Sequence, residues 1–191
     1  VVPPAPASAG PPGGLRAGPR VVQGVTAGVR LFVAVMPPPL VIDVLAELPR
    51  PEAPGLRWTG PDQWHVTLRF LGQADPDEAV AALGALSARP AVAGLGPVTA
   101  LLGNRLVMVP VAGLDEVAAA VVGVTAEVGR PPEDRPFVGH LTLARSKGPV
   151  PPGSVGAPLG GSFPVGEVCL VRSQTLPEGA RYDVLERFAL G

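Results

Sequence analysis

Two four-residue motifs carry the residue types that can do chemistry in this chain of 191 residues. They are HVTL at 65–68 and HLTL at 140–143, and they contain both histidines of the sequence. Side chains along a strand alternate between its two faces. The histidine and the threonine of each motif therefore share one face, and the two apolar residues point into a core. Two such strands side by side would present two imidazoles and two hydroxyls to one groove.

Two histidines that face each other can divide the work of general acid–base catalysis. An imidazole, whose ordinary pKa is about 6.5, can accept or donate a proton at neutral pH. One of His65 and His140 would take a proton from an attacking water and the other would give one to a leaving oxygen, each contributing roughly 10²- to 10⁴-fold in rate. The hydroxyls of Thr67 and Thr142 suit the non-bridging oxygens of a phosphodiester, whose charge grows as water adds. Two histidines without a third ligand make a poor zinc site, so we expect neither a metal nor a cofactor.

Composition and charge narrow the class of partner. The sequence holds 15 basic and 16 acidic residues, a net charge of −1. This balance argues against a protein that holds long nucleic acid by neutralising phosphates, and it allows one that handles an RNA end or a small nucleotide. Cys169 is the single cysteine, so no internal disulfide can form.

The same totals predict where the protein works. No apolar run reaches membrane-spanning length, and the first residues lack the pattern of a secretion signal. We therefore expect a cytoplasmic protein with no membrane contact. The balanced charge and the lack of a heptad pattern indicate a monomer.

The first 28 residues differ from the rest of the chain. They are rich in Pro, Gly and Ala and contain no acid, so they cannot bury enough surface to offset the entropy lost on ordering. We predict a disordered tail over 1–28 and a folded domain over 29–191. Because the sequence opens with Val and a domain-like strand begins at Val29, we also expect the true translation start at Val25 or Val29.

Hydrophobic periodicity and turn residues predict the order of the elements. The prediction places strands at 30–36, 56–58, 64–71, 92–102, 106–111, 137–145, 165–175 and 181–190, and helices at 40–48, 75–88 and 113–128. A strand, a helix and a motif strand recur in this order in both halves of the chain. The pattern indicates a loosely duplicated α+β unit.

Several segments together resemble one family of enzymes. The segments are RLFVAVMPP at 30–38, WHVTLRFLG at 64–72, HLTLAR at 140–145 and LVRSQTLPEGARYDVLERFAL at 170–190. Over about 29–191 the chain resembles the bacterial and archaeal RNA 2′,3′-cyclic phosphodiesterases, historically called 2′-5′ RNA ligases, of the two-histidine (2H) phosphoesterase superfamily. The resemblance implies two α+β lobes whose antiparallel sheets flank a central cleft, with helices outside. The chain departs from the family at Gly139, where Pro is frequent.

The resemblance also implies an activity and roles for the motif residues. The activity is metal-free hydrolysis of a 2′,3′-cyclic phosphate at an RNA end to a 2′-phosphomonoester, and some family members join RNA ends through a 2′-5′ bond. By likeness, His140 would activate the water and His65 would protonate the departing 3′ oxygen. Thr67 and Thr142 would hold the phosphate. The residues themselves leave the reverse assignment of the histidines open.

Two arginines near the motifs are candidates for substrate binding. Arg145 matches the arginine of the family that contacts the terminal phosphate or nucleotide. Strict alternation would place it on the opposite face from His140, so it needs a bulge or a strand end at Ala144 to reach the cleft. Arg69 shares the parity of His65 and is either a substrate contact or a solvated charge at the end of a strand.

Aromatic residues near the motifs could stack a base, as aromatic side chains do for single-stranded RNA. Trp58 is the candidate for this role. Parity places Trp64 and Phe70 on the core side of their strand, where packing is the expected role. Tyr182 is predicted to be structural.

Two other functions fit the same residues. The chain could be a non-catalytic module that binds nucleotides or RNA ends, which the two intact His–Thr pairs disfavour. It could also be a phosphodiesterase for 2′-5′ oligonucleotides or for other small cyclic phosphates. Turnover separates the first alternative from an enzyme, and product analysis across substrates separates the second.

Overall fold

The computed structural model describes residues 28–177 and 179–191, so only Gly28 of the predicted tail falls within it. In these residues it contains ten strands and three α-helices. The strands are β1 Val29–Val35, β2 Leu56–Trp58, β3 Val66–Ala74, β4 Ala91–Leu95, β5 Ala100–Leu102, β6 Leu106–Ala112, β7 His140–Ser146, β8 Gly161–Val165, β9 Glu167–Leu176 and β10 Gly179–Ala189. The helices are α1 Pro39–Ala46, α2 Pro76–Leu83 and α3 Asp115–Val124, with a 3-10 turn over Pro61–Gln63.

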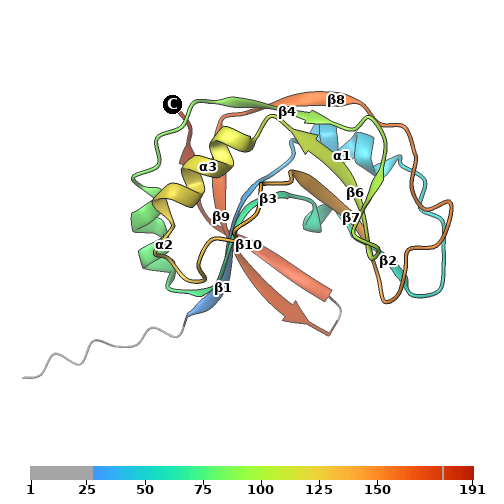
Figure 1. Cartoon of the computed structure of the whole chain (residues 1–191), viewed down its shortest axis with the longest axis horizontal. Coiled ribbons are helices and arrows are strands. Elements are labelled where there is room, and N and C mark those ends of the chain that lie inside the picture. The colour runs from blue at the N-terminus through green and yellow to red at the C-terminus, as the bar shows by residue number, and fades with distance from the viewer. Residues whose placement is uncertain (1–27, 178) are drawn as a thin grey trace, which may run out of the picture.

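The strands form one curled antiparallel sheet in the order β10-β9-β1-β3-β7-β6-β4-β8, with β2 added on β7 and β5 on β6 (Figure 1). The α+β class and the antiparallel pairing are confirmed. The resemblance implies antiparallel sheets that flank a central cleft, and in the structure the strands of both halves belong to one continuous sheet. The join is narrow, because β3 and β7 pair in register only at Val66 and Leu141. The two motif strands therefore meet where the halves of the sheet meet.

The helices begin as the sequence predicts and end earlier. Asp75 caps α2 by accepting a hydrogen bond from the backbone N–H of Asp77, and Pro76 occupies the first turn. Helix α2 ends at Leu83, before Gly84, and not near residue 88. Figure 1 shows α2 and α3 together at one end of the molecule and α1 at the other. In the described part of the chain no helix is long and apolar enough to cross a membrane.

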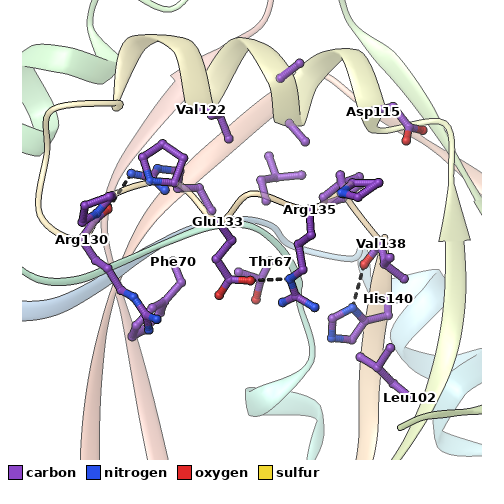
Figure 2. A pocket seen from close by; sticks show the side chains of 18 residues that line it. Thr67, Phe70, Leu102, Asp115, Val122, Arg130, Glu133, Arg135, Val138 and His140 are labelled. Atoms are coloured by element: carbon purple, nitrogen blue, oxygen red, sulfur yellow. Dashed lines mark hydrogen bonds and ion pairs between the residues drawn. The ribbon is translucent and has the colours of Figure 1, made fainter.

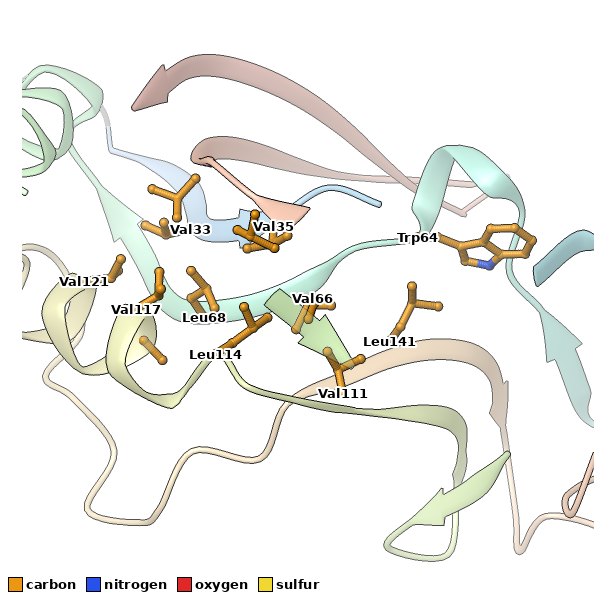
Figure 3. Packing of buried hydrophobic residues seen from close by; sticks show 14 of the residues in the cluster. Val33, Val35, Trp64, Val66, Leu68, Val111, Leu114, Val117, Val121 and Leu141 are labelled. Carbon is orange, nitrogen blue, oxygen red and sulfur yellow. The ribbon is translucent and has the colours of Figure 1, made fainter. Parts of the chain in front are cut away.

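The core lies between the helices and one face of the sheet. Apolar side chains from β1, β3, β6, β7 and α3 meet there, and Figure 3 labels Val33, Leu68, Val111, Val117 and Val121 among them. Each such side chain contributes roughly 1.5–3 kcal/mol when it is fully buried. Trp64, predicted on the core side, is 1% exposed, which confirms that prediction.

Two predicted strands prove to be wrong in extent. The strand predicted over 92–102 is broken into β4 and β5 at Gly96-Pro97. Gly96 has a φ of 93°, a Cβ there would lie 1.9 Å from the carbonyl oxygen of Leu159, and Pro97 has no N–H for a ladder. A further strand, β8, precedes the strand predicted over 165–175. The sequence did not indicate β8 because it follows directly on a Gly- and Pro-rich segment that predicts a loop.

The first motif strand also extends further than predicted. The sequence predicts its end at Leu71, before Gly72, but β3 continues to Ala74. Gly72 has a φ of 69° and lies at a register shift, where Leu31 pairs with Gly72 and Phe32 pairs with Phe70. A glycine in the left-handed region fits a bulge inside a strand as well as the end of one.

Candidate active site

The two histidines are held in the same local geometry. The Nδ1 atom of His65 lies 2.9 Å from the carbonyl oxygen of Gln63, and that of His140 lies 2.8 Å from the carbonyl oxygen of Val138. A carbonyl oxygen can only accept, so each Nδ1 carries the proton in the neutral ring. Each Nε2 is then left with its lone pair, available to exchange a proton with a bound substrate or water.

The threonines of the motifs accompany the histidines as the alternation predicts. Thr67 and Thr142 are half-buried on the groove side. Their apolar neighbours Val66 and Leu141 are fully buried on the core side. Thr67 and His140 line one pocket. The two motifs therefore contribute to one site although they come from opposite halves of the chain.

His65 lies in an aromatic enclosure. Its ring centroid is 4.7 Å from that of Phe32 and 4.9 Å from that of Tyr182, which meets it edge-on. Burial by these neighbours is the main reason that the pKa of His65 is lowered to about 4. In the free protein His65 is therefore neutral at neutral pH. The contact between Tyr182 and His65 escaped sequence reasoning, since the two residues are far apart in the chain.

The surroundings of His65 also bring positive charge close to it. The hydrogen bond to the carbonyl of Gln63 raises its pKa and partly offsets burial, whereas the charges of Arg145 and His140 lower the pKa further. One charge shifts the pKa of another group noticeably only when the two lie close together. Arg145 and His140 are therefore near enough to His65 to disfavour its charged form.

A bulge in β7 turns Arg145 toward the groove, which its predicted role as a substrate contact requires. Val107 pairs with Ala144 and Met108 with Thr142, so Leu143 is the extra residue in β7. Leu143 and Ala144 both point into the core, and the alternation resumes with exposed Arg145 on the face of Thr142. The predicted bulge exists, one residue earlier than Ala144.

A second bulge, in β3, has the opposite effect on Arg69. Val33 pairs with Arg69 and Ala34 with Thr67, so Leu68 is the extra residue. Residues directly opposite each other share a face of the sheet, and Arg69 therefore shares the core face of Val33. The parity argument that places Arg69 beside His65 and Thr67 fails at this bulge.

Arg69 is 5% exposed and is thus not a solvated charge at a strand end. Its Nε donates to the hydroxyl of Thr125 at 3.1 Å, and one terminal nitrogen donates to the carbonyl oxygens of Thr125 at 3.3 Å and Arg130 at 2.8 Å. These bonds join β3 to the end of α3 and to the start of the following loop. Part of the Arg69 side chain still lines the pocket that contains Thr67.

The same bulge moves Phe70 to the groove face. Phe70 pairs with Phe32, whose ring contacts His65, so the predicted core position of Phe70 is wrong. It is half-buried, and the guanidinium carbon of Arg30 lies 4.8 Å from its ring centroid. Phe70 lines the pocket beside Thr67.

Trp58 takes a different position from the one its predicted role needs. It pairs with buried Ala144 across β2 and β7 and so shares the core face. Its indole N–H donates to the carbonyl oxygen of Pro51 at 3.1 Å. The structure does not bring Trp58 together with the His–Thr pairs.

A pocket of about 450 Å³ opens beside Thr67 and His140. Figure 2 shows the side chains of Arg130, Glu133 and Arg135 reaching from the loop 130–138 toward the sheet. Glu133 and Arg135 form an ion pair. Sequence reasoning missed this wall of the site, although three prolines and four charged residues directly before the second motif were a signal for an ordered loop.

The loop 130–138 is anchored to the sheet at both ends. The N–H of Arg130 donates to the carbonyl of Leu71 at 2.7 Å, and the N–H of Val111 donates to the carbonyl of Gly139 at 2.9 Å. A Cβ at Gly139 would lie 2.2 Å from the carbonyl oxygen of Val111. The close approach of the two backbones explains the glycine that precedes His140.

The polar groups beside the motifs are imidazoles, hydroxyls and guanidiniums, and the wall of the pocket adds the carboxylates of Asp115 and Glu133, the latter paired with Arg135. Within residues 28–177 and 179–191 there is no group of three or more His, Cys, Asp or Glu side chains that could hold a metal ion. The donor set suits an anion, because hydroxyls and guanidiniums donate hydrogen bonds to anionic oxygens.

The curled antiparallel sheet with paired His–Thr strands defines a two-histidine phosphoesterase, and comparison with known proteins agrees. Residues 35–95 match the model of the LigT-like phosphoesterase family. The chain is 33% identical over 183 residues to an RNA 2′,3′-cyclic phosphodiesterase of Thermus thermophilus, covering 85% of this chain and 90% of that protein.

Solved structures agree with the fold. A Thermus thermophilus crystal structure matches with a TM-score of 0.67 and 30% identity over 84% of this chain and 97% of its own. Escherichia coli LigT complexed with 3′-AMP matches with a TM-score of 0.72 and 26% identity over 85% and 98%. The chain belongs to the RNA 2′,3′-cyclic phosphodiesterase family, which confirms the resemblance that its motifs indicate, and it is an enzyme of the cyclic phosphodiesterase class.

Proposed function

We propose that this chain hydrolyses the 2′,3′-cyclic phosphate of an RNA end or a nucleoside to a 2′-phosphomonoester, by general acid–base catalysis that needs no metal. One observation carries the proposal. Both imidazoles donate Nδ1–H to a backbone carbonyl two residues earlier, which leaves each Nε2 free for proton transfer beside a threonine hydroxyl. The name of the Thermus thermophilus relative supports the same substrate.

The reaction balances with the groups of the two motifs. Thr67 and Thr142 donate hydrogen bonds to the non-bridging oxygens of the phosphate. One imidazole takes a proton from the attacking water while the oxygen of that water forms a bond to phosphorus. The other imidazole delivers a proton to the 3′ oxygen as the bond between phosphorus and that oxygen breaks. Joining of two RNA ends through a 2′-5′ bond is the related reaction in which a 5′ hydroxyl replaces water.

Two assignments of the histidines compete. The lowered pKa of His65 keeps it neutral in the free protein, which favours it as the base. The likeness to the superfamily favours His140 as the base and His65 as the acid, and a bound anionic phosphate would raise the pKa of His65 toward that role. The two assignments differ in which imidazole must protonate the leaving oxygen.

Kinetics with 2′,3′-cyclic nucleotides test the proposal. His65→Ala and His140→Ala should each lower kcat at least about 10²-fold, while circular dichroism shows the folded state unchanged and exposed Arg105→Ala keeps full activity. Wild-type activity should survive a chelator. Activity that is lost with chelator and restored by a divalent cation would contradict the metal-free mechanism.

A sulfur in place of the 3′ oxygen separates the two assignments in the same assay. A thiolate leaves without a proton, so the variant that lacks the general acid should recover much of its loss on this substrate. Recovery by His140→Ala makes His65 the base, and recovery by His65→Ala makes His140 the base. Control reactions with the ordinary substrate, which neither variant should turn over appreciably, exclude contamination by another phosphodiesterase.

We also infer that the partner is an RNA terminus or a small nucleotide, and that the chain is a cytoplasmic monomer. The names of the relatives and the nucleotide bound to Escherichia coli LigT support the first part. The net charge of −1 supports a monomer that does not coat long nucleic acid. Light scattering of the purified protein measures the oligomeric state.

A further inference from the structure

The pocket beside His140 has an acid in the wall that the loop 130–138 forms. Glu133 lines the pocket from this loop, and its carboxylate pairs with Arg135. The side chain of Glu133 is 48% exposed, and the rest of it is covered by the protein. A carboxylate repels an anionic phosphate at short range. It is favourable in this pocket when it accepts hydrogen bonds from an uncharged part of the substrate.

The surroundings of Glu133 fix its position. Burial lowers the pKa of Arg69, and the charge of Glu133 partly opposes this effect. The carboxylate therefore lies near the guanidinium of Arg69 as well as that of Arg135. Backbone hydrogen bonds of Arg130 and Gly139 anchor the two ends of the loop that carries Glu133. A carboxylate that is held in this way before a ligand arrives is preorganised to bind it.

Phe70 supplies a flat apolar surface in the same pocket. It lies on the groove face three residues along β3 from Thr67, which is at most about 10 Å. The guanidinium carbon of Arg30 lies 4.8 Å from the centre of its ring. A Cβ added at Gly72 would lie 3.8 Å from the ring and 3.4 Å from the Cβ of Arg130, so Arg130 passes beside the ring. Aromatic rings stack on any base, so Phe70 offers a place to a base without choosing its identity.

The order of the lining residues suits a nucleotide. Figure 2 shows Glu133 between Phe70 on one side and His140 on the other, while the second acid, Asp115, lies near Val138 and away from Phe70. The volume of about 450 Å³ is in the range of sites for small ligands. A nucleotide whose phosphate lies against His140 and whose base stacks on Phe70 turns the edge of that base toward Glu133.

The four bases differ in what they offer to a carboxylate, which can only accept hydrogen bonds. Guanine has two neighbouring donors on its Watson–Crick edge, N1–H and the 2-amino group, and they match the two oxygens of one carboxylate. Adenine and cytosine offer an amino group beside an acceptor, and uracil offers one N–H between two carbonyl oxygens. An ionised carboxylate has about four acceptor positions, so Glu133 can keep its bond to Arg135 while it accepts from guanine.

We propose that Glu133 selects guanine as the base of the reacting nucleotide, a specificity that rests on the proposed function. Guanosine 2′,3′-cyclic phosphate is then a better substrate than the inosine analogue, which lacks the 2-amino group, and than the uridine analogue. Because the base takes no part in the reaction, the preference belongs to KM and not to kcat.

Steady-state kinetics with the guanosine, inosine and uridine 2′,3′-cyclic phosphates test the selection. In the wild type, kcat/KM for guanosine should exceed that for inosine about tenfold through KM, the loss expected for one hydrogen bond to a charged acceptor. In Glu133→Gln this ratio should fall to near one, because the amide keeps the shape of the side chain but has no charge and a single acceptor oxygen. Equal kcat/KM values for guanosine and inosine in the wild type would overturn the selection.

Two further variants separate the carboxylate from the loop that carries it. Arg135→Gln breaks the same ion pair and keeps the carboxylate, so it should retain the preference for guanosine over inosine at whatever overall activity it has. Asp134→Asn removes an exposed acid one residue away, outside the lining of the pocket, and should change the kinetics of neither substrate. An unchanged ratio in folded Glu133→Gln, or an equal loss of the ratio in Arg135→Gln, would overturn the role of the carboxylate.

Binding gives a readout that does not depend on turnover. The wild type should bind guanosine 2′-monophosphate about tenfold more tightly than inosine 2′-monophosphate, and Glu133→Gln should bind the two equally. A wild-type protein that shows this preference yet turns over none of the cyclic phosphates would overturn the proposed hydrolysis and leave the selection of guanine standing. Hydrolysis of all three substrates at equal kcat/KM would do the reverse.

Discussion

At the scale of single residues, the two His–Thr pairs are equal in sequence and unequal in surroundings. Both histidines use the same backbone hydrogen bond. Only His65 is enclosed by Phe32 and Tyr182, and burial there penalises the charged ring. The aromatic residues that pack against one of two chemically identical groups therefore make their pKa values differ, which under the proposed mechanism divides their roles.

The lowered pKa of His65 predicts a dependence of stability on pH. Since the folded pKa of about 4 lies below the ordinary value of 6.5, the unfolded chain binds more protons between these values. His65 thus costs the folded state nothing above pH 6.5 and roughly 3 kcal/mol once pH has fallen to about 4. Urea unfolding at several pH values measures this loss.

His65→Gln is the control for that titration. The variant lacks the ionising ring but keeps the acids that titrate near pH 4, so its free energy of unfolding should fall less steeply between pH 6.5 and 4. The His65 ring protons should also titrate with a midpoint near 4 in nuclear magnetic resonance spectra. Parallel stability curves for the two proteins would show that His65 titrates normally.

At the scale of elements, one extra residue in a motif strand redirects the next side chain. The bulge in β7 turns Arg145 into the groove, and the bulge in β3 turns Arg69 away from it. Arg69 then holds the end of α3 and the start of the loop 130–138. This loop forms one wall of the pocket beside His140. We infer that Arg69 is a positioning residue for that wall.

Replacement of Arg69 by methionine tests the role. Arg69→Met removes the donors to the carbonyls of Thr125 and Arg130, and we expect a loss of about 2–4 kcal/mol in the free energy of unfolding. Since the loop borders the pocket, KM should rise more than kcat falls. Exposed Arg89→Met is the matched control and should stay within about 0.5 kcal/mol of the wild type. An unchanged KM in folded Arg69→Met would show that the loop keeps its place without this clamp.

At the scale of the whole molecule, the site depends on a narrow junction. Val66 and Leu141 are the registered pair between β3 and β7, and both are fully buried. Each directly follows a histidine, so the junction that joins the two halves of the sheet also sets the spacing of the imidazoles. Loss of packing there should affect stability and catalysis together.

Leu141→Ala should lower the free energy of unfolding by about 2–5 kcal/mol, the usual cost of a cavity at a fully buried leucine. It should also lower kcat at temperatures where the variant is still folded, because His140 precedes the cavity. Leu40→Ala on α1, where leucine is 75% exposed, is the matched control. Chemical denaturation and kinetics on both variants make the comparison. Full kcat in folded Leu141→Ala would mean that the junction does not set the spacing of the imidazoles.

Much of the fold was predictable because it follows from local patterns. Apolar runs and apolar alternation predicted β1, β2, β6, β7 and β10 within a few residues, and turn residues predicted the starts of the helices. The errors fall where a segment distant in sequence decides the local structure. Strand β4 ends before Gly96 because the backbone of Leu159 lies against it there, and β8 forms because it can pair with the edge of β4. Short patterns contain no information about such partners.

The sequence by itself determined the chemistry of this protein: two imidazoles, each sharing a strand face with a hydroxyl, because the period of a strand is two residues. Tertiary structure alone decided which arginines reach the groove and how readily His65 takes a proton. A bulge depends on the register with the neighbouring strand, and burial depends on Phe32 and Tyr182, which approach His65 only in the folded chain. Composition and spacing are properties of one segment, whereas register and enclosure are properties of several segments at once.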